Sequence, residues 1–288
     1  MTATTPGELG AIVSRLRAAG CVFAEDEARI LTAAARTPAE LAAMVDRRVI
    51  GHPLEHVVGW ADFCGLRIAV SDGVFVPRRR SEFLVRQAVG VALAQGAVSA
   101  KASHPLPEEQ RVVVADLCCG SGAIGLAVVS ALAHTDLYAA DIEPAAVACA
   151  RQNLRAVGGH VYQGDLYDPL PASLRGRIDV LVVNAPYVPT GEIAFMPAEA
   201  RLHEPAVALD GGSDGVAMHR RVADGAPGWL AAGGHLLIET SARQAELTAA
   251  AVTASGLTAT VAAEDDVDAT VVIGSMTGVT ASGGELRR

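Results

Sequence analysis

The sequence is short of aromatic residues, of regularly spaced cysteines and of net positive charge, and each shortage excludes a class of protein. Only 4% of its 288 residues are aromatic, while 51% are hydrophobic and 29 are glycine. Small side chains of this kind suit helices that pack closely on a sheet. The five cysteines show neither Cys-x-x-Cys nor Cys/His ligand spacing, so we expect reduced thiols in a cytoplasmic protein and no bound metal.

The sequence also lacks an apolar run of the ~20 residues that a membrane-spanning helix requires. Its N-terminus has no basic stretch followed by an apolar block, so we expect no secretory leader. The formal net charge is −9, whereas nucleic-acid binding generally relies on a basic surface. A nucleic acid is therefore not the expected substrate. One compact basic cluster, Arg78-Arg79-Arg80, is either a solvated surface or a docking patch for a protein substrate.

The first part of the chain has the apolar spacing of short amphipathic helices. This spacing continues to about residue 50, and Pro38 stands near a helix start, where proline is tolerated. We expect residues 1–58 to form a small helical domain that recognises the substrate.

A change of period then indicates a linker. Residues 59–81 alternate like a β-hairpin, which includes Val74–Val76 and ends at Pro77. Ser81 is placed to cap the helix that follows. Residues 96–110 are loop-like in composition.

Residues 82–276 alternate between short buried strands and helices, the pattern of a parallel sheet covered by helices on both faces. The expected strands are 112–115, 137–140, 160–162, 180–183 and 235–239. The expected helices include 123–132, 144–154 and 218–230. Two more strands, 257–261 and 270–273, form an antiparallel pair that closes a seven-stranded Rossmann-like sheet. The remaining 277–288, rich in glycine and serine, are expected to be disordered.

A glycine-rich loop follows the strand 112–115 and precedes a helix, which is the context of a cofactor-binding turn. Residues Gly120 to Gly125 match the Gly-x-Gly-x-x-Gly pattern of dinucleotide-binding proteins. The carboxylate of Asp116, at the strand end, would repel a pyrophosphate but attract a positively charged cofactor. S-adenosylmethionine, cationic at its sulfonium and ammonium groups, therefore fits better than a nicotinamide dinucleotide.

Acidic residues also follow the next two strands. Asp141 and Ile142 end the second strand, where a carboxylate can accept hydrogen bonds from ribose hydroxyls. Asp165 and Leu166 follow the third, where the aspartate can bind an adenine amino group. Each aspartate alone could be a loop or helix-capping residue. Three at consecutive strand ends favour the cationic cofactor.

The fourth strand is followed by Asn184-Ala185-Pro186-Tyr187. A rigid turn of this kind places an amide acceptor, a backbone carbonyl and an aromatic face in one small volume. Such a group can hold a planar amino group, in an amide or a nucleobase, for methyl transfer. The other interpretation is an ordinary turn with a packed tyrosine, which the glycine loop in the same sheet disfavours.

Four segments together resemble the HemK-like family of protein-(glutamine-N5) methyltransferases, which modify peptide-chain release factors. They are Phe75–Glu82, Asp116–Gly122, Asn184–Pro189 and Glu204–Gly215, and the resemblance covers about residues 50 to 275. It implies a class I methyltransferase sheet, mostly parallel with an antiparallel last strand, and S-adenosylmethionine as the cofactor. The Asn-x-Pro-Tyr element is less specific alone, because nucleic-acid amino-methyltransferases share it.

The resemblance also implies roles for individual residues. The Asn184 side-chain oxygen and the Ala185 carbonyl would accept the two N–H groups of a substrate glutamine, with Pro186 in the same turn and Tyr187 packed on the flat amide. Cofactor contacts would come from Asp116, Cys118, Gly120, Gly122, Asp141, Ile142, Asp165, Leu166 and Asn184. Ala185 stands where the family has proline, which loosens the turn because proline would fix φ. Arg79 also replaces a usual proline.

Three functions compete at this point. The first is methyl transfer to a protein glutamine, with a release factor as the implied partner, and the second is N-methylation of a nucleic acid or small molecule. The third is a non-catalytic cofactor-binding module, which would not need the Asn184 motif. We expect His203 and His219 to be structural and the thiols of Cys118 and Cys119 to be packing groups, and we assign no general base.

Overall fold

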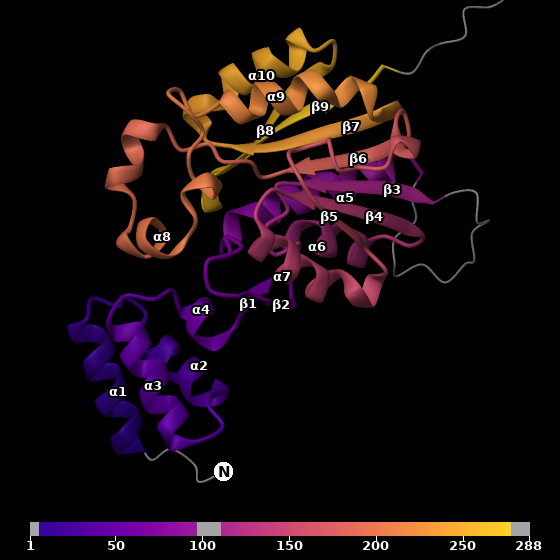
Figure 1. Ribbon diagram of the computed structural model, residues 1–288. Coiled ribbons are helices and arrows are strands. Elements are labelled where there is room, and N and C mark those ends of the chain that lie inside the picture. Colours follow the sequence, from indigo (N-terminus) through magenta and orange to yellow (C-terminus); the bar gives the residue numbers. More distant parts are fainter. Residues whose placement is uncertain (1–5, 97–110, 278–288) are drawn as a thin grey trace, which may run out of the picture.

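The computed structural model of the chain describes residues 6–96 and 111–277. Apart from Gly96 and Thr277, the expected loop at 96–110 and the expected tail at 277–288 lie outside the described residues. Figure 1 shows a bundle of N-terminal helices and a larger layered α/β part, joined by a small hairpin.

The N-terminal bundle has its own hydrophobic core. Its helices are α1 (Pro6–Ala18), α2 (Ala24–Ala34), α3 (Pro38–Val49) and α4 (Leu54–Val58). Leu16, Leu31 and Val45 are almost completely buried among them. The Thr37 hydroxyl accepts the backbone N–H of Glu40 at 3.1 Å and Pro38 opens α3, which is the placement of proline that the sequence predicts.

The hairpin consists of β1 (Trp60–Phe63) and β2 (Leu66–Ala69), which pair antiparallel. The prediction that Val74–Val76 forms part of this sheet is wrong. These residues belong to no strand that the structure describes, and their polar backbone atoms bond elsewhere: His56 Nε2 contacts the Val74 carbonyl at 2.8 Å, and Val76 donates to Glu204 at 3.3 Å. The apolar alternation that suggested a strand arises because Val74 and Val76 are both buried.

The large sheet has seven strands in the order β5-β4-β3-β6-β7-β9-β8. The strands are β3 (Val112–Leu117), β4 (Thr135–Asp141), β5 (His160–Gln163), β6 (Ile178–Val183), β7 (Leu230–Thr240), β8 (Thr258–Glu264) and β9 (Ala269–Ser275). From β5 to β7 neighbouring strands are parallel, and β9 runs antiparallel to both β7 and β8. The predicted α/β class, the sheet and its closing antiparallel pair are confirmed.

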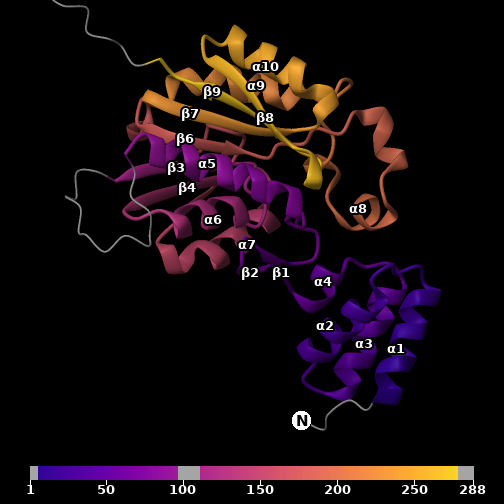
Figure 2. The ribbon, with the colours of Figure 1, turned by 180° about the vertical axis from the view of Figure 1, so that it is seen from behind.

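Helices cover both faces of this sheet (Figures 1 and 2). On one face lie α5 (Glu82–Ala94), α6 (Ala123–Ala131) and α7 (Pro144–Leu154), and on the other α9 (Ala217–Gly225) and α10 (Ala245–Ala254). A short helix, α8 (Ala198–His203), belongs to a segment that projects from the sheet edge toward the N-terminal bundle (Figure 1). Parallel strands buried on both sides explain the continuous apolar runs in the sequence.

The helix expected at 218–230 ends early. It stops at Gly225, a 3₁₀ turn (Ala226–Gly228) follows, and β7 begins at Leu230. Pro227 accounts for the difference, because proline lacks the N–H that a continuing α-helix requires. The other short 3₁₀ turns are 79–81, 155–157, 172–174, 190–195, 206–208, 242–244 and 265–267. Among the described residues, no helix is both long and apolar enough to cross a membrane.

Candidate active site

The predicted cofactor and catalytic residues converge on one cavity at the carboxyl ends of four parallel strands. The loops after β3, β4, β5 and β6 contribute Cys118–Ser121, Asp141–Glu143, Gly164–Leu166 and the turn at Asn184. Further walls come from the segment after the hairpin, from residues between Met196 and Leu209, and from α6, α7 and α9. Because carboxyl ends of parallel strands meet at one sheet edge, segments far apart in sequence become neighbours here. Of the predicted site residues, only Asp116, Gly122 and Ala185 do not line the cavity.

The glycine loop depends on left-handed backbone. Cys118, Gly120 and Gly122 have φ values of 55°, 55° and 76°, a region that glycine adopts without strain. Gly122 immediately precedes α6, and a Cβ there would lie 3.1 Å from Cγ of Leu154. Position 122 therefore requires glycine both for its left-handed φ and for lack of space for a side chain. The loop bends sharply enough to present Gly120 to the cavity.

Asp116 lies beneath this loop rather than beside the cavity. It is 1% exposed, and its Oδ2 accepts the Gly125 N–H at 2.8 Å. A Cβ on Gly125 would lie 2.9 Å from that oxygen, so the missing side chain lets α6 approach the strand and cover the aspartate. Burial raises the pKa of Asp116 to about 7, opposed by the Gly125 hydrogen bond. The expectation that its carboxylate sits at the cofactor is not met by this geometry.

Asp141 does reach the cavity and also organises it. Its Oδ2 accepts the Gly120 N–H at 2.8 Å, and its Oδ1 accepts the Glu143 N–H at 2.9 Å. Burial raises the pKa of this carboxyl, while those two hydrogen bonds oppose the shift. Each carboxylate oxygen keeps a second lone pair. Asp141 can therefore hold the glycine loop and still accept from ligand hydroxyls.

The third predicted carboxylate is neutralised by a partner that the sequence did not suggest. Asp165 lines the cavity beside Leu166, and its Oδ2 lies 2.7 Å from an NH2 of Arg221 on α9. Arg221 also lines the cavity. The cluster of three negative charges expected around the cofactor is thus reduced: Asp116 is covered, Asp165 is paired, and Asp141 with Glu143 carries the acidic character of the wall.

The Asn-Ala-Pro-Tyr turn presents three of its four residues to the cavity. Asn184, Pro186 and Tyr187 line it, whereas Ala185 is 1% exposed and packs into the core beneath the sheet edge. Asn184 Nδ2 donates to the Ser81 hydroxyl oxygen at 3.2 Å. Its Oδ1 forms no hydrogen bond with any residue that the structure describes. A free amide oxygen at the cavity is an acceptor for an incoming N–H.

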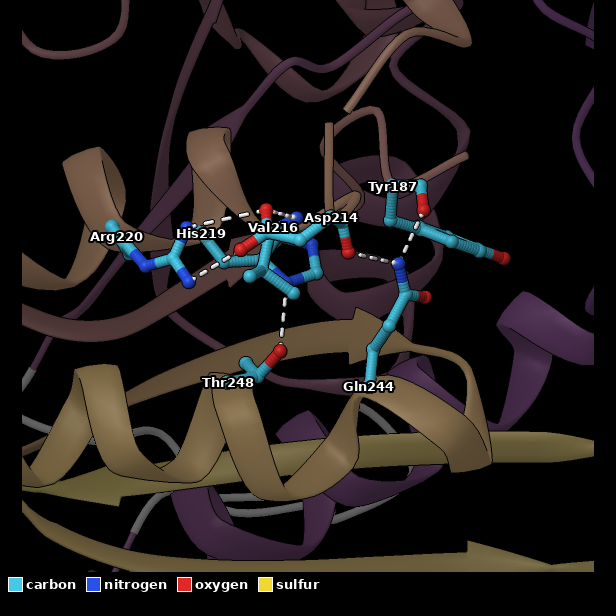
Figure 3. A network of polar contacts seen from close by, with 7 residues as sticks. All are labelled: Tyr187, Asp214, Val216, His219, Arg220, Gln244 and Thr248. Atoms are coloured by element: carbon cyan, nitrogen blue, oxygen red, sulfur yellow. Dashed lines mark hydrogen bonds and ion pairs between the residues drawn. The ribbon is translucent and has the colours of Figure 1, made fainter. Parts of the chain in front are cut away.

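Figure 3 shows how the turn is held from behind. Gln244 Nε2 donates to the Tyr187 carbonyl at 2.8 Å and to the Asp214 carbonyl at 3.1 Å, and its Oε1 accepts from the Ser241 hydroxyl at 2.5 Å. A Cβ on Gly215 would lie 2.0 Å from that Nε2 and 2.4 Å from the Tyr187 carbonyl oxygen. The buried amide of Gln244 therefore ties the Tyr187 backbone to a glycine-rich loop.

Two arginines of the basic cluster pair with buried acids at the cavity. Arg78 NH2 lies 2.5 Å from the buried Glu204, and Arg80 Nε lies 3.4 Å from the buried Glu239. Both arginines line the cavity, while Arg79 is exposed and does not. These pairs contradict a freely solvated surface for Arg78 and Arg80, whereas docking of a protein substrate on the cluster stays a prediction. The two buried acids could not be predicted as partners from the sequence, because they lie 126 or more positions away in the chain.

Ser81 does not cap α5. It is the last residue of the 3₁₀ turn before the helix, its side chain makes no capping hydrogen bond, and it is 1% exposed. Its hydroxyl oxygen lines the cavity side of the turn and accepts from Asn184 Nδ2 at 3.2 Å. The Ser81 side chain, which the sequence predicted as a helix cap, therefore belongs to the site instead.

The histidines and cysteines have the structural roles expected of them. His219 is completely buried, its Nδ1 lies 2.9 Å from the Thr248 hydroxyl, and burial lowers its pKa to about 4 (Figure 3). The His203 ring lies 4.2 Å from that of His52 in the N-terminal bundle. Burial is the main cause that raises the pKa of the Cys118 and Cys119 thiols, so both stay protonated and poorly nucleophilic.

Comparisons with known proteins agree with this geometry. Residues 102–217 match the family described as "Methyltransferase small domain". A release factor glutamine methyltransferase of Geobacter sulfurreducens is 35% identical over 73% of this chain and 69% of its own length. One from Bradyrhizobium diazoefficiens is 33% identical over 85% of each chain. A 4-amino-L-phenylalanine/4-methylamino-L-phenylalanine methyltransferase of Streptomyces pristinaespiralis is 34% identical over 74% of this chain and 69% of its own.

The family match at residues 102–217 includes the glycine loop and the Asn184 turn, and the two release factor methyltransferases are matched over most of their length. Methyl transfer from S-adenosylmethionine is the activity that these features share with the matched family. This chain belongs to the family of release factor glutamine methyltransferases and is an S-adenosylmethionine-dependent N-methyltransferase.

Proposed function

We propose that the protein transfers a methyl group from S-adenosylmethionine to the side-chain amide nitrogen, N5, of a glutamine in a protein, and that this protein is a peptide-chain release factor. The observation that carries the proposal is the free Oδ1 of Asn184 at the cavity, in a turn shared with Tyr187. The names of the relatives supply the acceptor class, and the protein would act in the cytoplasm.

The cavity suits the cofactor in charge and in shape. Asp141 offers spare carboxylate lone pairs to ribose hydroxyls, and the half-exposed Ile142 beside it offers an apolar surface to a base. Gly120 lets the backbone come close to the ligand. Asp165, already bonded to Arg221, would accept an adenine amino group through its remaining lone pairs. When bound, the cofactor supplies an electrophilic methyl group on a positively charged sulfur.

The chain's own residues then orient the acceptor. An amide nitrogen is a weak nucleophile because its lone pair is delocalised into the carbonyl group. Asn184 Oδ1 would accept one substrate N–H, the Ala185 carbonyl would accept the other, and the Tyr187 ring would cover the flat face. This leaves the nitrogen lone pair directed at the methyl group. Positioning of this kind, rather than proton removal, is the proposed source of the rate.

A macromolecular acceptor is supported by the segment that carries α8. Phe195 and Leu202 on this segment are 86% and 65% exposed, and neighbouring Met196 lines the cavity. Glu199 of α8 pairs with Arg48 of the N-terminal bundle at 2.6 Å. The bundle and the cavity wall are thus physically linked, and we propose that both contact the protein substrate.

The test is incubation with methyl-labelled S-adenosylmethionine and purified release factors, followed by mass mapping of any methylated residue. The expected result is one methylated glutamine. Asn184→Ala should reduce turnover on the order of 10²-fold or more because an acceptor that aligns the amide is lost. Cofactor affinity should stay within a few-fold of wild type. Turnover by this variant equal to wild type would remove Asn184 from the site.

The Streptomyces pristinaespiralis relative favours a second candidate, N-methylation of the amino group of a small aromatic amino acid. The same Asn184 oxygen could accept from an aromatic amine. Parallel incubation with 4-amino-L-phenylalanine separates the two candidates. Methylation of that compound with none on any release factor would replace the proposed acceptor while leaving the chemistry in place.

A further inference from the structure

Arg80 brings a cation to the Asn184 turn that the proposed function does not use. It stands beside Ser81, whose hydroxyl oxygen accepts from Asn184 Nδ2 at 3.2 Å, and its guanidinium carbon lies 5.8 Å from the centre of the Tyr187 ring. Residues 80 and 81 thus lie against both ends of the turn. The Arg80 side chain is 42% exposed and lines the cavity, so its polar atoms can reach an acceptor that is bound there.

A buried carboxylate holds Arg80 in this place. Glu239 is 2% exposed, and its Oε1 lies 3.4 Å from Arg80 Nε and accepts from the Tyr187 OH at 3.3 Å. One oxygen therefore anchors the arginine and the tyrosine next to each other. Glu239 itself does not line the cavity, so it supports the site from behind and leaves Arg80 as the group of the pair that a ligand can touch.

The ion pair leaves donors of Arg80 available to a ligand. A guanidinium carries five N–H groups, one on Nε and four on the terminal nitrogens. The ion pair with Glu239 engages Nε, so terminal N–H groups remain. Because the pair is neutral as a whole, its attraction for a further negative charge is weak. The remaining donors therefore suit an uncharged carbonyl oxygen better than a second carboxylate.

The acceptor in the proposed function carries such an oxygen. In an amide the nitrogen and the oxygen are bonded to the same carbon and lie only about 2.2 Å apart. An amide that gives an N–H to Asn184 and lies on the Tyr187 ring therefore brings its carbonyl oxygen into the same part of the cavity. An acceptor that is buried without a donor is unfavourable. Arg80, next to Tyr187, is placed to supply that donor.

We propose that Arg80 binds the carbonyl oxygen of the acceptor amide through its terminal N–H groups, so that the site recognises the whole amide and not its nitrogen alone. The inference rests on the proposed function, because it takes the Asn184 oxygen as the partner of the amide N–H. It adds a specificity-determining residue. An aromatic amine such as that of 4-amino-L-phenylalanine, the compound in the name of one relative, has no carbonyl beside its nitrogen and would leave these donors of Arg80 without a partner.

The contribution of Arg80 should affect acceptor binding and not the methyl-transfer step. As the amide nitrogen attacks the methyl group, its lone pair leaves the amide resonance and the carbonyl oxygen loses negative charge. A donor to that oxygen therefore stabilises the bound acceptor at least as well as the transition state. Loss of such a contact raises KM and leaves kcat unchanged or higher. Loss of a residue that only supported Tyr187 would instead lower kcat.

The decisive variant is Arg80→Lys. Lysine keeps a positive charge for Glu239, but its single nitrogen cannot serve that carboxylate and the acceptor together. We expect KM for a release factor to rise about tenfold or more, with kcat and the cofactor affinity by calorimetry within about threefold of wild type. Arg86→Lys changes an arginine that also pairs with a glutamate but does not line the cavity, and it should match wild type. An unchanged KM in Arg80→Lys would overturn the proposal. A tenfold loss of cofactor affinity would assign Arg80 to the cofactor carboxylate and would overturn it too.

Two small probes test the carbonyl contact without methyl transfer. One is a single glutamine blocked at both backbone ends, and the other is its methyl ketone isostere, which keeps the carbonyl but has CH3 in place of NH2. In the presence of S-adenosylhomocysteine, ligand-observed NMR should show that Arg80→Lys weakens binding of both probes about tenfold, whereas Asn184→Ala weakens binding of the amide alone. Equal affinity of the ketone for wild type and Arg80→Lys, or no binding of the ketone to wild type, would overturn the inference. The expected binding pattern without any methylated glutamine from wild type would overturn the proposed function alone.

Discussion

Gln244 offers the sharpest test of how the catalytic turn is held in place. Its Nε2 bonds two backbone carbonyls, those of Tyr187 and Asp214, and both hydrogen bonds are visible in Figure 3. Gln244→Met keeps the length and volume of the side chain but removes both donors. The Tyr187 carbonyl is covered by Gly215, so water cannot replace the lost donor there. Asp214 is only half-buried, so water can partly compensate.

The expected cost of Gln244→Met follows from these environments. One buried carbonyl without a partner costs about 1–3 kcal/mol, and a partly hydrated one costs less, so the total should be about 2–3 kcal/mol. With a urea m-value of about 3 kcal/mol/M, the unfolding midpoint should fall by about 0.7–1 M. Circular dichroism during a urea titration measures this shift.

Gln244→Glu adds a charge test to the same position. An ionised carboxylate has no proton to donate and would face two carbonyl oxygens, so its folded-state pKa must rise above the ordinary ~4.3. A raised pKa means that this variant is most stable below the ordinary value and loses stability as the pH rises through the raised one. A rise of two units costs about 2.7 kcal/mol at pH 8.

The difference in urea midpoint between the two variants tests whether position 244 faces the two carbonyl groups. At pH 5 Gln244→Glu should approach Gln244→Met in urea midpoint, and at pH 8 it should be clearly less stable. A difference between them that does not change from pH 5 to pH 8 would show that position 244 does not face the two carbonyls. Gln244 would then not be the residue that holds the Tyr187 backbone in place.

Two further predictions concern the carboxylates of the glycine loop. Burial raises the pKa of Asp116 to about 7, so the protein should be most stable below the unfolded-state pKa of this group and lose stability as the pH rises from about 4 to 7. Asp116→Asn should therefore make the urea midpoint nearly independent of pH between pH 5 and 8. A pH slope equal to that of wild type would contradict this. Asp141→Asn should weaken S-adenosylmethionine binding at least about tenfold by calorimetry, because one amide oxygen cannot serve the Gly120 and Glu143 N–H groups and a ligand together. Asp165→Asn keeps one oxygen that can accept the adenine amino group and changes a carboxylate that is already paired with Arg221. This variant should lose under about threefold, so equal losses at positions 141 and 165 would refute the distinction.

The fold could be predicted because its signals are local. The strand at 180–183 and the helix at 144–154 are recognisable as runs of buried residues or by helical spacing, and the structure has them at Ile178–Val183 and Pro144–Leu154. Parallel strands place their carboxyl ends together. Because the glycine loop and the Asn184 turn each follow a predicted parallel strand of the same sheet, the sequence alone indicates that they are neighbours.

The supporting side chains could not be predicted, because nothing local marks them. Gln244 is 57 positions from Tyr187, and Glu204 is 126 from Arg78. Arg221 and Glu239 likewise act on residues of other segments. From the sequence, Arg78 and Arg80 were interpreted as part of a solvated surface or a docking patch, because nothing near them in the chain marks the buried acids that they contact. Their buried acidic partners became visible only in three dimensions.

The alanine at position 185 illustrates how the two kinds of information combine. From the sequence, Ala185 in place of proline loosens the turn, since φ is no longer fixed. In the structure the turn is restrained from outside: Val188 donates to the Leu209 carbonyl at 3.0 Å, and Gly211 donates to the Val188 carbonyl at 2.8 Å.

The glycine loop behind Tyr187 explains why this restraint is tight. A Cβ on Gly211 would lie 2.7 Å from the Tyr187 Cα, so the two backbones pack in direct contact. Gln244 closes the same arrangement from the other side. Rigidity that a proline would provide within the turn is provided here by the segment from Glu204 to Gly215 and by Gln244, which immediately precedes α10. The substitution at 185 therefore does not argue against catalysis: the geometry of Asn184 and Tyr187 depends on contacts that this chain retains.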